Sequence, residues 1–134
     1  MDQVDFTVNN DFKNAIKPLE AVYRKAAIEI LTKSFCDSEP ITRYAHIHHA
    51  DFVPFAEEVI DRALRDKMGM IAVDENDHLI ACVISEDLAE RFEPHFAKYP
   101  RMELIFEVLD RLFVHSLTEK KIIPGKIIHM WLAG

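Results

Sequence analysis

Residues 70–85, MIAVDENDHLIACVIS, constrain the fold more than any other stretch of this sequence. Two apolar runs flank a polar tip at Glu75, Asn76 and Asp77, which is the pattern of a β-hairpin and therefore of an antiparallel strand pair. Within each run the apolar residues occupy neighbouring as well as alternate positions. We therefore expect the sheet to be covered on both faces.

Other periodic segments lie on either side of this hairpin. Alternation predicts a strand at 3–8 and apolar residues predict a strand at 126–134, while stripes of apolar residues predict helices at 18–35, 51–64, 87–98 and 101–119. In the last helix the stripe comprises Met102, Ile105, Phe106, Leu109, Leu112, Phe113 and Leu117, which we expect to be core. The order β-α-α-β-β-(α)-α-β predicts an α/β (α+β) fold with a mixed, mainly antiparallel sheet and helices on both faces.

The bulk properties exclude several classes of function. A chain of 134 residues is long enough for a single domain with a core, and its net charge of −7 argues against a general binder of nucleic acid backbones. No apolar run reaches the length of a membrane span, and the N-terminus lacks the pattern of a signal peptide. We expect a cytoplasmic protein with no membrane partner, whose two cysteines, Cys36 and Cys82, are reduced and buried.

The loop SFCDSEPITRYAHIHHAD, residues 34–51, concentrates side chains that can do chemistry. His46, His48 and His49 lack a known metal-ligand spacing, so we expect no metal site. Cys36 follows an apolar helical face, which disfavours a thiol nucleophile with a histidine base. Two interpretations remain open for the histidines: exposed loop residues, or residues that line a pocket for a substrate.

Three features together resemble the N-terminal half of the GNAT N-acetyltransferases, and within them the arylalkylamine branch. They are FCDSEPI at 35–41 after a long helix, GMIAVDENDHLIA at 69–81, and a last strand that ends in WLAG at 131–134. The resemblance implies a single domain, 1–134, which is truncated after the fourth strand. The Gly-rich loop that holds coenzyme A pyrophosphate in that family does not occur in this sequence, which argues that the chain is inactive alone.

The resemblance also implies a set of site residues. It implies acetyl transfer from acetyl-CoA to a small amine, with Glu39 as the catalytic base. The residues implied to bind the amine are Phe35, Pro40, His46, His48 and His129. The cofactor side would be at Leu132, Ala133 and Gly134.

Two other functions compete with the enzyme. An apolar strand that ends at Gly134 is expected to need a further strand, so the chain is alternatively a non-catalytic half-fold that binds a small ligand or dimerises through its C-terminal strand. A small sensor domain with a similar layout is the third hypothesis.

Overall fold

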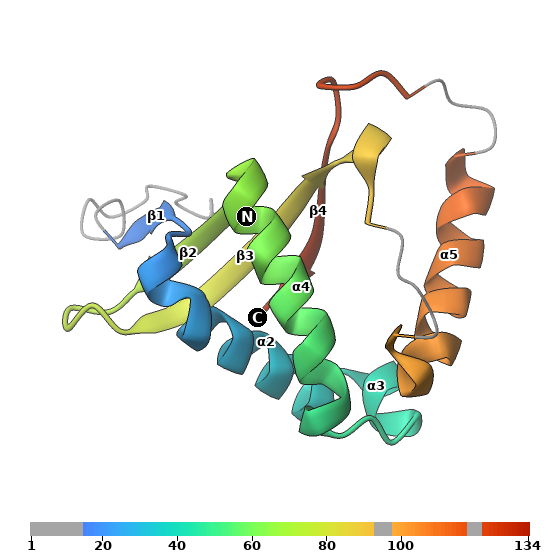
Figure 1. Ribbon diagram of the computed structural model, residues 1–134, viewed down its shortest axis with the longest axis horizontal. Coiled ribbons are helices and arrows are strands. Elements are labelled where there is room, and N and C mark those ends of the chain that lie inside the picture. The colour runs from blue at the N-terminus through green and yellow to red at the C-terminus, as the bar shows by residue number, and fades with distance from the viewer. Residues whose placement is uncertain (1–14, 93–97, 118–121) are drawn as a thin grey trace, which may run out of the picture.

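The computed structural model describes residues 15–92, 98–117 and 122–134. In chain order its elements are β1 (Ile16–Pro18), a 3-10 turn (Ala21–Tyr23), α2 (Arg24–Ser38), α3 (Pro40–Tyr44), α4 (His49–Asp66), β2 (Gly69–Val73), β3 (Leu79–Asp87), 3-10 turns at Leu88–Glu90 and Pro100–Met102, α5 (Glu103–Leu117) and β4 (Ile128–Ala133). Figure 1 shows these elements along the chain. The strand predicted at 3–8 lies outside the described residues, as does part of the helix predicted at 87–98.

The four strands form one sheet in the order β1-β2-β3-β4, and every pair is antiparallel. The predicted hairpin is confirmed, because Ile71 lies opposite Cys82 and Met70 opposite Val83. Asp74 closes its tip by accepting hydrogen bonds from the backbone N–H groups of Asn76 and His78. The expected α+β class with an antiparallel sheet is therefore confirmed.

Helices α2 and α4 pack on one face of the sheet (Figure 1). Leu31 of α2, Ile60 of α4 and Ile71 and Ile84 of the sheet are all nearly inaccessible to solvent, and they form the centre of the core. Side chains that point to the opposite face, such as Met70 and Met130, are exposed. The second layer of helices expected from the sequence is not seen among the described residues.

The turn from α4 into β2 is not made by a glycine. Lys67, in the left-handed conformation with φ of 56°, ends α4. Gly69 is instead the first residue of β2, and a Cβ at this position would lie 2.8 Å from the Cβ of Leu19. Glycine is needed here because the chain before α2 approaches the strand closely, and not because the helix must stop.

The start of α4 differs from the sequence-based expectation. Residue His48 is the N-cap, and the Asp51 carboxylate accepts a hydrogen bond from its backbone N–H at 3.1 Å. The sequence predicted a helix that begins at Asp51, which instead lies inside α4. It stabilises the same helix end from the third helical position.

Strand β4 forms one edge of the described sheet. Gly134 and Cys82 exchange both backbone hydrogen bonds at 2.9 Å, so the neighbouring pair Ala133–Val83 is of the non-hydrogen-bonded type. The N–H and C=O of Ala133 therefore point away from β3. Pairing of this edge with a second copy of the chain stays a prediction.

No helix within the described ranges is long and apolar enough to cross a membrane.

Candidate functional site

A cavity of about 570 Å³ lies between α5 and the sheet face that also carries α4. Figure 1 shows α5 standing beside the layer of α2 and α4. The cavity is lined by Phe35, Glu39, Ile41, Thr42, Phe52, Phe55, Glu86, Arg91, Phe92, Met102, Ile105, Phe106, Leu109, Asp110, His129 and Leu132. Its volume falls within the range of small-molecule sites, about 300–1,000 Å³.

Aromatic rings form most of the wall. Phe35 of α2 and Phe52 of α4 stack with centroids 5.4 Å apart. Phe55 lies 5.5 to 5.7 Å from Phe52 and Phe92 in edge-to-face geometry, and 5.0 Å from Phe106 of α5. Rings in mutual contact are held in fixed orientations and present both faces and edges to a ligand.

Glu86 lies in the cavity wall where β3 ends, and its carboxylate is almost fully buried. It accepts hydrogen bonds from Arg62 Nη1 at 3.1 Å and from the backbone N–H of Phe92 at 2.6 Å. Its other oxygen lies 3.0 Å from His129 Nδ1, and the two residues are directly opposite each other on β3 and β4. Because a carboxylate only accepts hydrogen bonds, Nδ1 of His129 carries the hydrogen.

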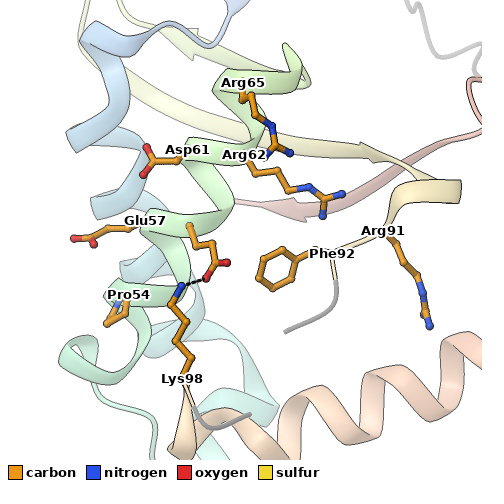
Figure 2. A pocket seen from close by; sticks show the side chains of 9 residues that line it. Pro54, Glu57, Asp61, Arg62, Arg65, Arg91, Phe92 and Lys98 are labelled. Carbon is orange, nitrogen blue, oxygen red and sulfur yellow. Dashed lines mark hydrogen bonds and ion pairs between the residues drawn. The ribbon is translucent and has the colours of Figure 1, made fainter. Parts of the chain in front are cut away.

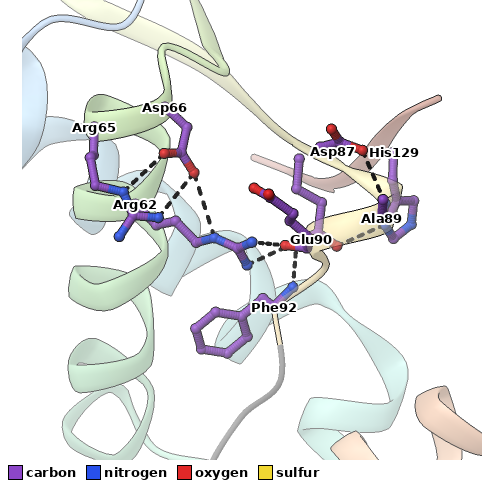
Figure 3. Close-up of polar contacts among 9 residues, drawn as sticks. Arg62, Arg65, Asp66, Asp87, Ala89, Glu90, Phe92 and His129 are labelled. Atoms are coloured by element: carbon purple, nitrogen blue, oxygen red, sulfur yellow. Dashed lines mark hydrogen bonds and ion pairs between the residues drawn. The ribbon is translucent and has the colours of Figure 1, made fainter. Parts of the chain in front are cut away.

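Arg62 connects the Glu86 carboxylate to the outer side of α4. Figure 3 shows its guanidinium reaching from the helix to the backbone of Glu90, whose carbonyl oxygen accepts a hydrogen bond from Nη2. Asp66 holds the same side chain from one helical turn away, at 3.7 Å. The segment that carries Arg91 and Phe92 is thereby tied to α4 and to the sheet.

Glu39 occupies another corner of the cavity, at the beginning of α3. It is the N-cap of that helix and accepts hydrogen bonds from Ile41 N at 3.1 Å, Thr42 N at 2.6 Å and Thr42 Oγ1 at 2.7 Å. Partial burial by itself raises the pKa of the Glu39 carboxyl, but the hydrogen bonds from Thr42 and Ile41 outweigh it and bring the pKa below its usual 4.5. Glu39 is therefore ionised at neutral pH and is a weak proton acceptor.

The charges of the cavity do not cancel. Asp110 of α5 pairs with Arg91 at 3.3 Å, and Glu86 pairs with Arg62. Within the described part of the chain, no cationic side chain pairs with Glu39. Over the residues that the structure describes, the Glu39 carboxylate therefore has no counter-ion in this largely aromatic cavity.

A second hollow, of about 800 Å³, lies on the outer side of α4 (Figure 2). It shares Arg91 and Phe92 with the aromatic cavity, but the rest of its lining consists mainly of charged side chains. Several of these are paired with one another or with neighbours, as in Lys98 with Glu58 at 3.0 Å and Arg65 with Asp66 at 2.9 Å. This outer groove is a solvated surface of mutually neutralised charges and is a weaker candidate.

The three histidines of the loop at 34–51 are exposed and lie outside the lining of the aromatic cavity. His46 is exposed with φ of 55°, His48 caps α4, and Nε2 of His49 lies 2.8 Å from Asp37 Oδ1 at the surface. Among the described residues, no three side chains of metal-ligand type converge. Burial, followed by the nearby Asp37 and Asp51 carboxylates, raises the pKa of the Cys36 thiol to about 11, which disfavours a nucleophile.

The structure brings together four of the residues that the sequence singled out: Phe35, Glu39, His129 and Leu132 all line the cavity. His46, His48 and Pro40 do not. Ala133 is the last residue of β4, and both backbone groups of the following Gly134 are hydrogen-bonded to Cys82. The roles expected for these residues stay predictions.

Glu86 is not among the candidate residues that the sequence analysis singled out. The signal was present in the strand periodicity. Cys82, Ile84, Glu86 and Leu88 occupy every second position, and all four are buried. Extension of this alternation beyond Ser85 identifies Glu86 as an inward-facing carboxylate.

No family model matches this chain, and no curated protein does. Among solved structures, one similar chain is described as the C-terminal condensation domain of Ebony in complex with beta-alanyl-dopamine. It aligns with a TM-score of 0.75 at 17% identity, over 89% of this chain and 57% of that one. The likeness shows a shared fold, and this chain spans little more than half the length of that neighbour.

The assignment to the GNAT N-acetyltransferases is corrected by this finding. The neighbour is a condensation domain, so the expected transfer of acetyl from acetyl-CoA to an amine is wrong as a function for this chain. The stretches at 35–41, 69–81 and 131–134 specify helix ends and strand pairing, and one fold hosts many chemistries. Nothing in the structure tests whether the chain binds acetyl-CoA, which stays a prediction.

Proposed function

We propose that this chain binds a small aromatic amine, or an amide that retains both an aromatic ring and an ammonium group, in the aromatic cavity. The observation that carries the proposal is Glu39, an ionised carboxylate in an aromatic cavity, with no cationic side chain of the described residues paired to it. A ligand ammonium supplies the missing positive charge. The surrounding rings bury the aromatic part of the ligand and attract the cation through their faces.

Two further features support this ligand class. The cavity volume of about 570 Å³ accommodates a drug-sized molecule, so the amide of an aromatic amine also fits. The structural neighbour was solved with beta-alanyl-dopamine, whose name describes such an amide. That ligand is a property of the neighbour and serves here as a guide to chemistry.

Calorimetric titration with tyramine tests the proposal. Hexylamine has the ammonium but no ring, and we expect it to bind about tenfold more weakly or worse, because the ring supplies most of the buried apolar area. If the protein gives no heat with tyramine at millimolar concentration, or binds both amines equally, the proposal fails.

A pair of variants on α5 locates the binding site. Leu109 lines the cavity, so Leu109→Trp is expected to fill it and weaken tyramine by about tenfold. Leu112 lies on the same helix and does not line the cavity. Leu112→Trp is the matched control, and an equal loss in both variants would place the ligand elsewhere.

A further inference from the structure

The hydrogen-bond capacity of Glu39 limits the kind of ammonium group that the aromatic cavity can hold. A carboxylate has about four acceptor positions on its two oxygens. Oε1 of Glu39 accepts a hydrogen bond from Ile41 N at 3.1 Å, while Oε2 accepts from Thr42 N at 2.6 Å and from Thr42 Oγ1 at 2.7 Å. About one acceptor position, on Oε1, remains for a ligand.

The backbone carbonyl groups around Glu39 add little to this capacity. This corner of the cavity is lined by Phe35, Glu39, Ile41 and Thr42. The carbonyl oxygen of each already accepts a backbone hydrogen bond at 2.9 to 3.3 Å, from Glu39, Arg43, Ala45 and Ile47 in that order. Thr42 gives its hydroxyl hydrogen to Glu39 and is 2% exposed, so its own oxygen offers almost no surface to a ligand. Among these lining residues, Glu39 Oε1 is therefore the acceptor that a ligand can use.

The other surfaces of this corner are apolar. Phe35 lies one helical turn before Glu39, and its ring stacks on Phe52 with 5.4 Å between the ring centroids. Ile41 lines the cavity and is 38% exposed. Carbon surfaces of this kind are stabilised when a methyl group covers them, but they offer no strong acceptor to an N–H group. The corner therefore favours carbon substituents on a ligand nitrogen over every N–H group beyond the first.

Ammonium groups differ in how many hydrogens they must place. A primary ammonium has three N–H donors, so at Glu39 two of them are left facing carbon or water. We infer that the cavity selects a tertiary aromatic amine, with two methyl groups on nitrogen and one N–H group donated to Glu39 Oε1. This inference rests on the proposed function and deepens it, because it specifies the substitution on the ligand nitrogen.

A quaternary ammonium is disfavoured for the opposite reason. It keeps the positive charge and the methyl contacts, but it has no N–H group to donate to Glu39 Oε1. Hydrogen bonds between charged partners are about twice as strong as those between neutral ones, so the loss outweighs the gain from a further methyl group. Affinity should therefore pass through a maximum at one N–H group.

A series of four ligands and the wild-type chain give the first test. Tyramine and its N-methyl, N,N-dimethyl and N,N,N-trimethyl derivatives share one ring and one phenol, and all four are cations at pH 7. By calorimetry we expect affinity to rise about threefold with each of the first two methyl groups and to fall about fivefold with the third. Thermal melting in the presence of each ligand repeats the comparison by an independent measurement.

The outcomes of this series separate the inference from the proposed function. Equal affinities, or a maximum at any compound other than the dimethyl derivative, would overturn the inference and leave the proposed function standing. Absence of binding by all four compounds at millimolar concentration would overturn both.

A pair of variants at Ile41 tests whether acceptor capacity is the cause. Ile41→Thr places a hydroxyl oxygen beside Glu39, and it is expected to remove the threefold preference for the dimethyl over the monomethyl compound. Ile41→Val shortens the same side chain without adding an acceptor, so it should retain that preference. An equal preference in the two variants would overturn the acceptor count on which the inference rests.

Glu39→Gln then places the ammonium group. It removes the charge that all four ligands are inferred to meet, and it should weaken each of them by about fivefold or more. Glu58→Gln is the matched control, because Glu58 lines the outer groove and not the aromatic cavity. Equal effects of the two variants would overturn the placement of the nitrogen at Glu39.

Discussion

Helix α4 serves two regions of the molecule that are built in different ways. In its second half, Val59, Ile60 and Ala63 pack with the aliphatic side chains of α2 and the sheet and are almost inaccessible. In its first half, Phe52 and Phe55 face a cavity whose other walls carry three carboxylates. We call these the packed region and the hollow region. The comparison teaches that the aliphatic residues of α4 pack into a solid core, whereas its aromatic residues form the wall of a cavity.

The largest difference between the two regions is expected in stability. Ile60→Ala in the packed region should lower the free energy of unfolding by about 3 kcal/mol, because Ile60 is fully buried and its removal leaves a void. Leu109→Ala in the hollow region should cost under about 1 kcal/mol, since that side chain is half exposed. Urea denaturation measures both, and similar losses would abolish the distinction.

The buried carboxylate of the hollow region gives the next largest effect. Glu86→Ala removes the partner of Arg62 and the acceptor for the Phe92 backbone N–H, and it should cost about 2 kcal/mol in unfolding free energy. Asp61→Ala on α4 removes an exposed partner of Arg24 on α2, and it should cost under about 1 kcal/mol. If Glu86→Ala lowers the free energy of unfolding no more than Asp61→Ala does, the buried Glu86 carboxylate does not stabilise the hollow region.

A smaller effect with a pH signature is expected at the other corner. The pKa of Glu39 is lowered in the folded chain, so its contribution to stability is present above the pKa of the unfolded state and is lost as pH falls through the lower folded value. At pH 7, Glu39→Gln should cost about 1 kcal/mol through the weakened cap of α3.

Chemical denaturation of wild type and Glu39→Gln across the acid range measures this signature. We expect the two curves to converge at acid pH, below the folded pKa of Glu39. A constant difference at all pH values would show that the carboxylate charge is irrelevant to the cap.

The smallest expected effect concerns the two thiols. Burial raises the pKa of Cys82 to about 11, and Cys36 has a pKa raised to the same value, so at pH 8 only about a thousandth of each thiol is thiolate. Both should resist an aromatic disulfide reagent in the folded chain and react fully in urea. Cys36 is the less buried of the two and should react first. Faster labelling of Cys82 would contradict the assignment of that residue to the packed region.

The packed region could be predicted from sequence and the hollow region only in part. The hairpin at 70–85 was predictable because apolar runs around a polar tip leave few alternatives. The stripe on α5 was correctly placed on a helix, and Met102, Ile105 and Phe106 are buried as expected. Leu109 and Leu112 of the same stripe are half exposed or more, because the helix leaves the core there and Leu109 faces the cavity. Side-chain placement for Phe113 and Leu117 lies outside the described residues.

Periodicity identifies the face of a helix that turns inward, but it does not say whether atoms or a cavity lie opposite. The same limit explains why the helix-capping role of Glu39 was not predicted. The resemblance singled out Glu39 as a catalytic base, but its role as a helix cap depends on hydrogen bonds from Thr42, which the sequence pattern does not reveal. The local sequence therefore pointed to Glu39 but did not predict its role as a helix cap.

The hydrogen bonds of Glu86 restrict how this end of the cavity can evolve. Its carboxylate joins β3 to α4 through Arg62, to β4 through His129 and to the segment after β3 through Phe92 N. A substitution of Glu86 removes all three contacts at once, so this position can be altered only together with compensating changes around it. Leu109 of α5 lines the cavity with a half-exposed apolar side chain, and single substitutions at this position are the accessible route to a new ligand preference.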